Sequence, residues 1–129
     1  MKLLVSCLWV GAGGFAGAIA RFLVARASAS WFGVGFPYGT FIVNITGSFL
    51  LGLVATIAAL KVLPWPEPLR LAIAVGFLGA YTTFSTFSYE SNSLLEDGEL
   101  LRAMLNVLGS LLAGLIAIRL GILVARGWS

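Results

Sequence analysis

The sequence carries very little charge. Only 10% of its 129 residues are Asp, Glu, Lys or Arg, whereas soluble domains carry about 25%. It has no histidine and a single cysteine, Cys7. These shortages exclude a disulfide within the chain, cysteine–histidine metal sites and histidine-based catalysis, so we do not expect an enzyme. The net charge of +3 is spread out without a basic run, which argues against nucleic acid as a partner.

Apolar residues fill the space between the few charges, and the mean hydropathy is +1.02. Uncharged stretches cover residues 3–20, 27–60, 71–89 and 103–118. A helix needs about 20 mostly apolar residues to cross a bilayer. Hydrocarbon admits only helices or closed barrels, because it offers the backbone no hydrogen-bonding partner. The sequence therefore predicts an all-α membrane protein with one domain over residues 1–129, whose four transmembrane helices cover about 3–24, 38–60, 69–95 and 100–124.

Four spans place both chain ends on one side of the membrane. The basic residues Lys2, Lys61, Arg70 and Arg126 then lie on that side, and Arg26 and Arg102 lie on the other. Because basic residues favour the cytoplasmic side, this near balance gives only a weak preference for orientation. Two alternatives stay open: the termini lie in the cytoplasm, or the chain inserts both ways and two opposite copies form an antiparallel dimer.

One face of the first predicted helix carries Gly13, Gly17 and Arg21 at four-residue spacing. Small residues at this spacing allow close helix packing in lipid. An arginine within a span should face protein or water, or extend its head group to the membrane surface. Both explanations of Arg21 remain open.

Polar stripes also run along the second and fourth predicted helices. Asn44 and Ser48 share one face of the second helix, and Asn106, Ser110 and Gly114 share one face of the fourth. Each stripe alone is typical of polar contacts between membrane helices. Together they predict a polar seam through the bundle.

The third predicted helix carries five hydroxyl side chains among the seven residues 82–88. Gly76 and Gly79 weaken the helix just before them. These hydroxyls either bond back to the preceding turn of a kinked helix, or they accompany a break that frees backbone carbonyls. Freed carbonyl oxygens would suit a small hard cation.

Two phenylalanines and one carboxylate complete this segment. Phe84 and Phe87 lie three residues apart, and Glu90 is the one acidic residue deep enough in a span to be costly. Phenylalanine in a membrane helix usually faces lipid or the core, but the positive edge of its ring also suits an anion that has lost water. The seam is richer in hydrogen-bond donors than in negative charge, which favours a path for an anion.

These motifs resemble those of the Fluc family of fluoride channels, also called CrcB. The resemblance covers nearly the whole chain: GxxxGxxxR at 13–21, VNITGSFLLG at 43–52, GFLGAYTTFSTFSYE at 76–90 and NVLGS at 106–110. The third motif is the most specific. Two positions depart from the family pattern, since Ala80 replaces a glycine found in many members and Gly114 replaces a threonine found in some.

The resemblance implies an antiparallel, dual-topology homodimer in the plasma or inner membrane of a prokaryote. In the lipid, this dimer would carry fluoride passively out of the cell through two pores. The third helix would be broken in the middle of the membrane. A structural sodium ion, which is not transported, would lie at this break on the dimer axis, bound by the backbone carbonyls of Gly79 and Thr82 from both copies. The positions that match the family's fluoride path are Asn44, Phe84, Phe87, Ser85, Thr86, Ser110, Arg21 and Glu90.

Two kinds of transporter compete with a channel. Small multidrug-resistance exporters also have four short spans, but they depend on an acidic residue in the first helix, and residues 3–24 contain none. A proton-coupled fluoride exporter that uses Glu90 remains open. A purely structural membrane protein would not need the donor-rich seam.

Overall fold

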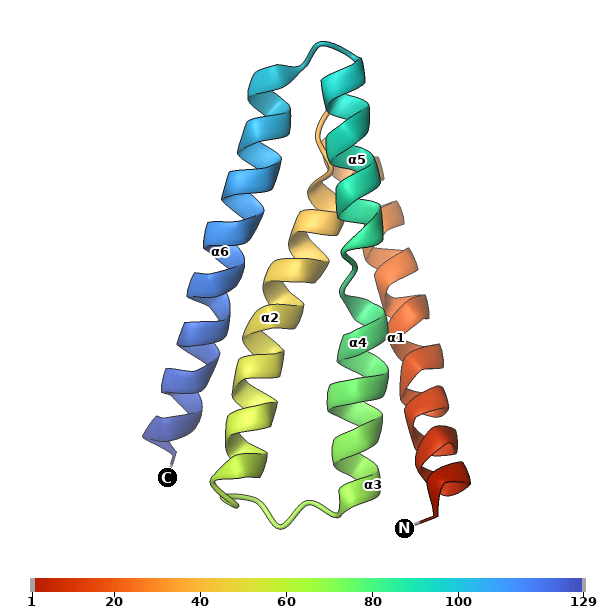
Figure 1. Cartoon of the computed structure of the whole chain (residues 1–129), viewed down its shortest axis with the longest axis vertical. Helices are drawn as coiled ribbons and strands as arrows, with labels where there is room; N and C mark the ends of the chain where they lie inside the picture. The colour runs from red at the N-terminus through yellow and green to blue at the C-terminus, as the bar shows by residue number, and fades with distance from the viewer. Residues whose placement is uncertain (1, 129) are drawn as a thin grey trace.

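The computed structural model describes residues 2–128, and all regular structure in this range is helical (Figure 1). The elements are α1 Leu3–Phe32, α2 Tyr38–Ala59, α3 Glu67–Arg70, the π-helix η1 Leu71–Phe77, α4 Leu78–Tyr81, α5 Ser85–Glu96 and α6 Leu100–Gly127. Four stretches are long and apolar enough to cross a membrane, and the third combines α3, η1, α4 and α5. The prediction of an all-α protein with four such helices is confirmed.

The first helix is longer than the sequence predicts. It continues to Phe32 instead of ending near Val24, because residues 25–30 alternate alanine with arginine or serine and contain no glycine or proline. The predicted loop therefore shrinks to residues 33–37. Gly33 ends the helix with φ at +77°, a backbone conformation that glycine adopts without steric cost.

The bundle is built from two closely packed pairs. α2 lies against α6, and α1 lies against η1 and α4. Glycines make both contacts possible. A Cβ atom on Gly121 would lie 2.1 Å from the Phe49 carbonyl oxygen, and one on Gly17 would lie 2.2 Å from the Phe77 carbonyl oxygen. Close backbone approach of this kind is typical of helices that associate in lipid.

The third span departs from regular α-helix at two places. Residues 71–77 form the π-helix, and the helix is interrupted between Tyr81 and Ser85, near the middle of the span. Thr82 has extended backbone angles, with φ at −86° and ψ at 156°. The interruption changes the direction of every side chain that follows it, so α4 and α5 present different faces to their neighbours.

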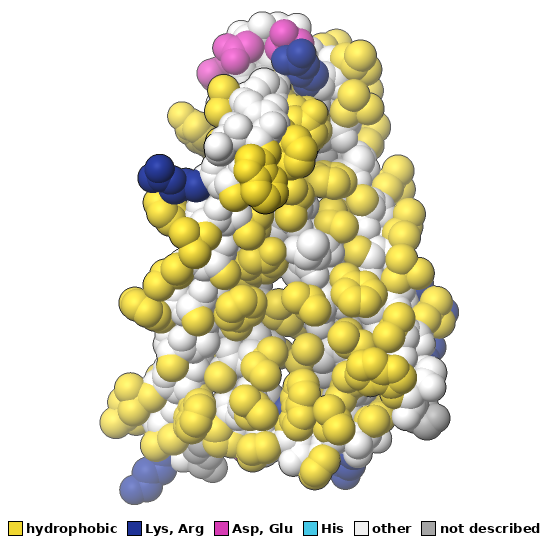
Figure 2. Space-filling model, turned by 180° about the vertical axis from the view of Figure 1, so that it is seen from behind, with side chains coloured by type: hydrophobic (Ala, Val, Ile, Leu, Met, Phe, Trp, Pro, Cys, Tyr) yellow, Lys and Arg dark blue, Asp and Glu magenta, His cyan; other side chains and the backbone are white. Residues whose placement is uncertain are grey.

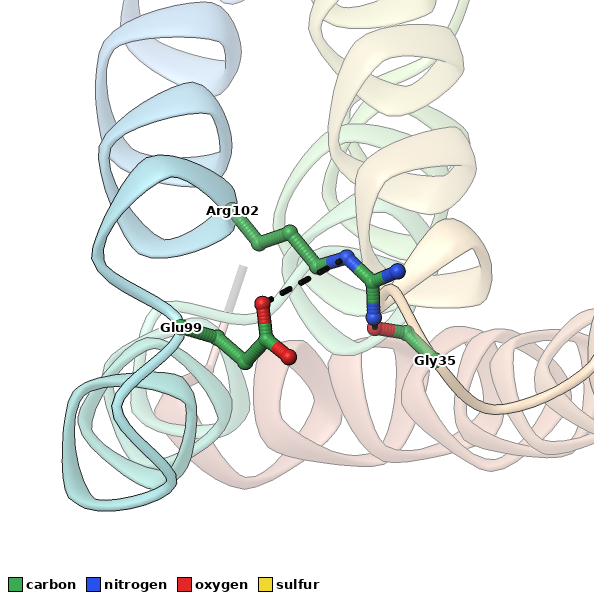
Figure 3. Close-up of polar contacts among 3 residues, drawn as sticks. All are labelled: Gly35, Glu99 and Arg102. Carbon is green, nitrogen blue, oxygen red and sulfur yellow. Dashed lines mark hydrogen bonds and ion pairs between the residues drawn. The ribbon is translucent and has the colours of Figure 1, made fainter.

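Charged side chains mark both ends of the bundle, and apolar side chains cover much of the surface between them (Figure 2). The start of α1, the end of α6 and the connector before α3 lie at one end, and the other connections lie at the opposite end (Figure 1). At that opposite end, Arg102 Nη1 donates to the Gly35 carbonyl at 3.2 Å, and Arg102 Nε lies 3.8 Å from Glu99 Oε2 (Figure 3). These exposed contacts join the two connections but add little stability.

Candidate functional site

A groove of about 490 Å³ opens beside the interruption of the third span. Residues of α2, η1, α4, α5 and α6 form its walls, together with the linking residues 82–84. Its lining includes six of the ten residues predicted for the site: Asn44, Gly79, Thr82, Phe84, Phe87 and Ser110. None of the residues that line it is acidic, and leucines complete its walls.

Asn44 holds the interruption in place from α2. Its Nδ2 donates to the Thr83 carbonyl at 3.0 Å, and its Oδ1 accepts from the Thr83 amide at 2.8 Å. A side-chain amide offers both a donor and an acceptor, so it can satisfy both backbone groups of a residue that has left the helix. Asn44 keeps its second Nδ2 proton for another partner.

The interruption takes several backbone carbonyls out of the helical hydrogen-bond pattern. In a continuous helix the Gly79 carbonyl would accept from the Thr83 amide, which instead donates to Asn44. The Thr82 carbonyl would accept from the Thr86 amide, which donates to Thr83 Oγ1 at 3.3 Å. The Ala80 carbonyl accepts instead from Arg21 Nε at 2.9 Å. The Gly79 and Thr82 carbonyls are therefore available to another partner.

The sequence left open whether the hydroxyls of this segment bond back to the preceding turn or accompany a break, and the structure shows both. Thr82 Oγ1 donates back to the Leu78 carbonyl at 2.9 Å, as hydroxyls do in kinked helices. Thr83 Oγ1 donates to Thr86 Oγ1 at 3.1 Å. It also accepts from the Thr86 amide, and so replaces a helical acceptor at the start of α5.

The two phenylalanines line the groove together. Their ring centroids lie 5.9 Å apart, and their planes are tilted by 43°. Phe87 is half-buried, whereas Phe84 is 79% exposed in the single chain. So large an exposed apolar surface is common only at a contact with lipid or with another protein surface.

A second cavity of about 380 Å³ lies on another side of α5, and Thr86 and Glu90 line it. Thr40 of α2 also lines this cavity and donates its hydroxyl to Glu90 Oε1. The sequence motifs do not point to Thr40. It lies one turn before Asn44, so the stripe of Asn44 and Ser48 could have been extended back to it.

Two predicted path residues line neither cavity. Arg21 bonds to the Ala80 carbonyl, and Ser85 is exposed, with its Oγ 3.5 Å from Thr83 Oγ1. The structure thus brings most of the predicted residues to two neighbouring cavities and places Arg21 against the interruption instead.

No group of three or more His, Cys, Asp or Glu side chains that could hold a metal ion occurs among residues 2–128. The site's oxygen atoms come from the backbone, hydroxyls and amides. Such neutral oxygens can bind a hard monovalent cation, and amide and hydroxyl protons that are not engaged elsewhere can face an anion.

The family model described as "CrcB-like protein, Camphor Resistance (CrcB)" matches residues 8–122. The chain belongs to the CrcB family. This CrcB protein is similar over almost its whole length to bacterial proteins that carry the name "Fluoride-specific ion channel FluC".

Three relatives illustrate the similarity. A protein of Prosthecochloris aestuarii is 49% identical over 122 residues, which cover 95% of this chain and 94% of that protein. One of Chlorobaculum tepidum is 50% identical over 121 residues, with 94% of each chain covered. One of Geobacter metallireducens is 49% identical over 113 residues, which cover 88% and 90%.

Proposed function

We propose that this CrcB protein is a fluoride-selective channel that lets fluoride leave the cell down its gradient. The observation that carries the proposal is the groove itself. It combines amide and hydroxyl groups with two phenylalanine rings, and none of its lining residues is acidic. The relatives of this protein bear the name of fluoride channels, which supports fluoride as the anion.

Fluoride holds its water tightly, so a selective path must replace that water with donors. Asn44 can offer its second Nδ2 proton, and Ser110 can offer its hydroxyl. Phe84 and Phe87 can offer the positive edges of their rings. Thr86 and Glu90 would continue the path in the second cavity, where the Thr40 hydroxyl holds the carboxylate.

A structural sodium ion fits the freed carbonyls. Gly79 and Thr82 have lost their helical donors, both residues line the groove, and a Cβ on Gly79 would meet no atom within 4 Å. Two carbonyls are too few ligands for a hard cation. A second copy of the chain would supply two more, and the ion would then hold the two interruptions together.

We propose that the chain forms an antiparallel homodimer in the plasma or inner membrane of a prokaryote. The exposed groove supports the dimer. Phe84 and Gly79 both face outward from the single chain. A second copy in the opposite orientation would cover Phe84. It would also bring its own Gly79 and Thr82 carbonyls next to those of the first copy, around the two-fold axis of the dimer. Lipid would cover the outer apolar surfaces.

The test is fluoride flux from liposomes that contain the purified protein. A channel should release fluoride when a membrane potential is imposed, and release little chloride under the same conditions. Chloride flux as fast as fluoride flux, or no electrical current, would reject the channel. Flux that requires a proton gradient would instead favour a proton-coupled exporter, the second candidate, which the half-buried Glu90 and its bond to Thr40 make worth testing.

The ring-edge contribution can be tested in the same liposomes. Phe87→Ile keeps an apolar side chain, although a smaller one, and removes the ring, so fluoride flux should fall by at least about tenfold, a change that corresponds to about 1.4 kcal/mol. Phe15→Ile is a matched control, because Phe15 lies on α1 outside the groove. Equal flux in wild type and Phe87→Ile would remove the ring edges from the mechanism.

A further inference from the structure

Asn106 is a buried polar residue behind the groove. Its side chain is 1% exposed and is one of the two largest fully buried side chains of the described chain. It lies on α6 and does not line the groove, yet it contacts two hydroxyls that lie on different helices. These are Ser91 of α5 and Ser110 of α6.

The direction of each hydrogen bond in this cluster follows from one of them. Ser91 Oγ donates its single proton to the Phe87 carbonyl at 2.7 Å. Its 2.9 Å contact with Asn106 must therefore have Asn106 Nδ2 as the donor. The other end of that amide is the acceptor Oδ1, which faces Ser110. Ser110 consequently gives its only proton to Asn106, at 3.3 Å.

Each of the two buried residues of this cluster, Ser91 and Asn106, lies one helical turn from a residue that lines the groove. On α5, Phe87 lies one helical turn from Ser91, and on α6, Ser110 lies one turn from Asn106. Phe87 and Ser110 both line the groove, whereas Ser91 and Asn106 are buried behind them. Asn106 therefore holds two helices together at the place where the groove between them ends.

The two serine bonds differ in strength. Bonds between oxygens are usually about 2.7–2.8 Å long, so the Ser91 bond is strong and the 3.3 Å bond of Ser110 is weak. Ser110 can therefore turn its proton away from Asn106 at small cost. An anion in the groove needs that proton, because a hydroxyl whose proton is engaged elsewhere presents only lone pairs.

We propose that Asn106 is a positioning residue that controls the proton of Ser110. Its Oδ1 holds the hydroxyl proton until fluoride arrives and then yields it to the anion, so Asn106 competes with fluoride and weakens its binding enough to allow release. The inference rests on the proposed function, since it takes fluoride as the anion. Asn106 itself does not touch the anion.

A double-mutant cycle in full-length protein tests this coupling, with conductance measured against fluoride concentration. Asn106→Leu removes the competing acceptor, so the fluoride concentration that gives half-maximal conductance should fall. We expect a decrease of about threefold or more, which corresponds to the free energy of a weak hydrogen bond. Ser110→Ala should raise half-saturation. The double variant should match Ser110→Ala, because Asn106 acts through Ser110. A double variant in which the two shifts multiply would overturn the proposal.

Asn106→Asp supplies a second measurement that a purely structural role would not reproduce. An ionised carboxylate is a stronger acceptor and repels fluoride, and at this buried position the loss of water raises the pKa of a carboxyl. The fluoride concentration at half-saturation should therefore rise at about pH 8 and fall back toward the wild-type value at about pH 5.5, where more of the carboxyl is protonated. The proposal would be overturned if the fluoride concentration at half-saturation did not depend on pH in this variant. This measurement decides the proposal even if Asn106→Leu does not fold. A wild-type protein without fluoride current would reject the proposed function itself, whereas failure of these variants alone would reject only the role of Asn106.

Discussion

Asn44 and Asn106 are two amides with different tasks. Asn44 takes the place of a missing helical turn and satisfies both backbone groups of Thr83. Asn106 joins α5 to α6 from a buried position. The sequence predicts that each amide faces the neighbouring helices, because helical periodicity places it on the polar face of its own helix. It does not predict the partner, because the register between two helices depends on packing along their whole length.

Replacing Asn44 should weaken both stability and conduction. Asn44→Ala leaves the amide and the carbonyl of Thr83 without their partners. Each unsatisfied buried group costs about 1–3 kcal/mol, or about 2–6 kcal/mol for two groups, and the open groove lowers the expected cost for this pair to about 1–3 kcal/mol. We expect a lower midpoint of thermal unfolding in detergent, followed by circular dichroism, and fluoride flux reduced by at least about tenfold.

Ser48→Ala is the matched control for the stability measurement. Ser48 lines the same groove one turn beyond Asn44, and its loss should change stability by no more than about 0.5 kcal/mol. If Asn44→Ala and Ser48→Ala unfold at the same temperature, Asn44 does not hold the interruption.

At the scale of elements, the interruption of the third span is the feature that makes the site. The glycines and hydroxyls of residues 76–88 indicate a weak helix there, but they leave both a kink and a break open. The break depends on contacts from other helices, namely Asn44 from α2 and Arg21 from α1. No local pattern reveals the π-helix at 71–77, which lies against the glycine-rich face of α1.

Close packing of α1 against this irregular span can be tested at Gly17. A methyl group there would lie 2.2 Å from the Phe77 carbonyl oxygen, so Gly17→Ala must push the helices apart. Overpacking costs about 1–3 kcal/mol, and we expect a lower midpoint of thermal unfolding.

Gly11→Ala on the same helix is the control. A Cβ on Gly11 would meet no atom within 4 Å, and alanine favours the helix by up to about 1 kcal/mol. Its unfolding midpoint should equal or exceed that of the wild type. Equal destabilisation by both substitutions would show that helix propensity, and not the contact with Phe77, decides the effect.

At the scale of the whole molecule, the proposed dimer would complete a site that is open in the single chain. The groove is open, Phe84 is exposed, and the freed carbonyls of Gly79 and Thr82 are too few to surround a cation. A second copy would supply the missing surfaces. The near balance of basic residues leaves an antiparallel dimer open and the resemblance to the family implies one, but neither periodicity nor composition encodes which lipid-facing surface meets a partner.

The proposed sodium ion predicts a dimer that depends on sodium. Prolonged exchange of sodium for N-methylglucamine at constant ionic strength should dissociate the dimer in light scattering and abolish conduction, and restored sodium should reverse both changes. Thr82→Val should keep this dependence, because the ligand is a carbonyl and not the hydroxyl, which already bonds to Leu78. An intact, conducting dimer after complete exchange would contradict the ion.

Insertion in both orientations can be measured from the two ends of the bundle. Basic residues occupy both ends, so the positive-inside rule gives little preference (Figure 2). In a Cys7→Ser background, Leu63→Cys places a thiol in the connector before α3, and Asp97→Cys places one in the turn at the opposite end. Both positions are exposed.

If the chain inserts equally in both orientations, an impermeant maleimide applied to intact spheroplasts should label about half of each variant. Lysed spheroplasts, in which both variants should label fully, provide the control for reactivity. Full labelling of one variant and none of the other would establish a single orientation. An antiparallel dimer could not then form, and the two freed carbonyls at Gly79 and Thr82 would need a ligand other than a cation shared between opposite copies.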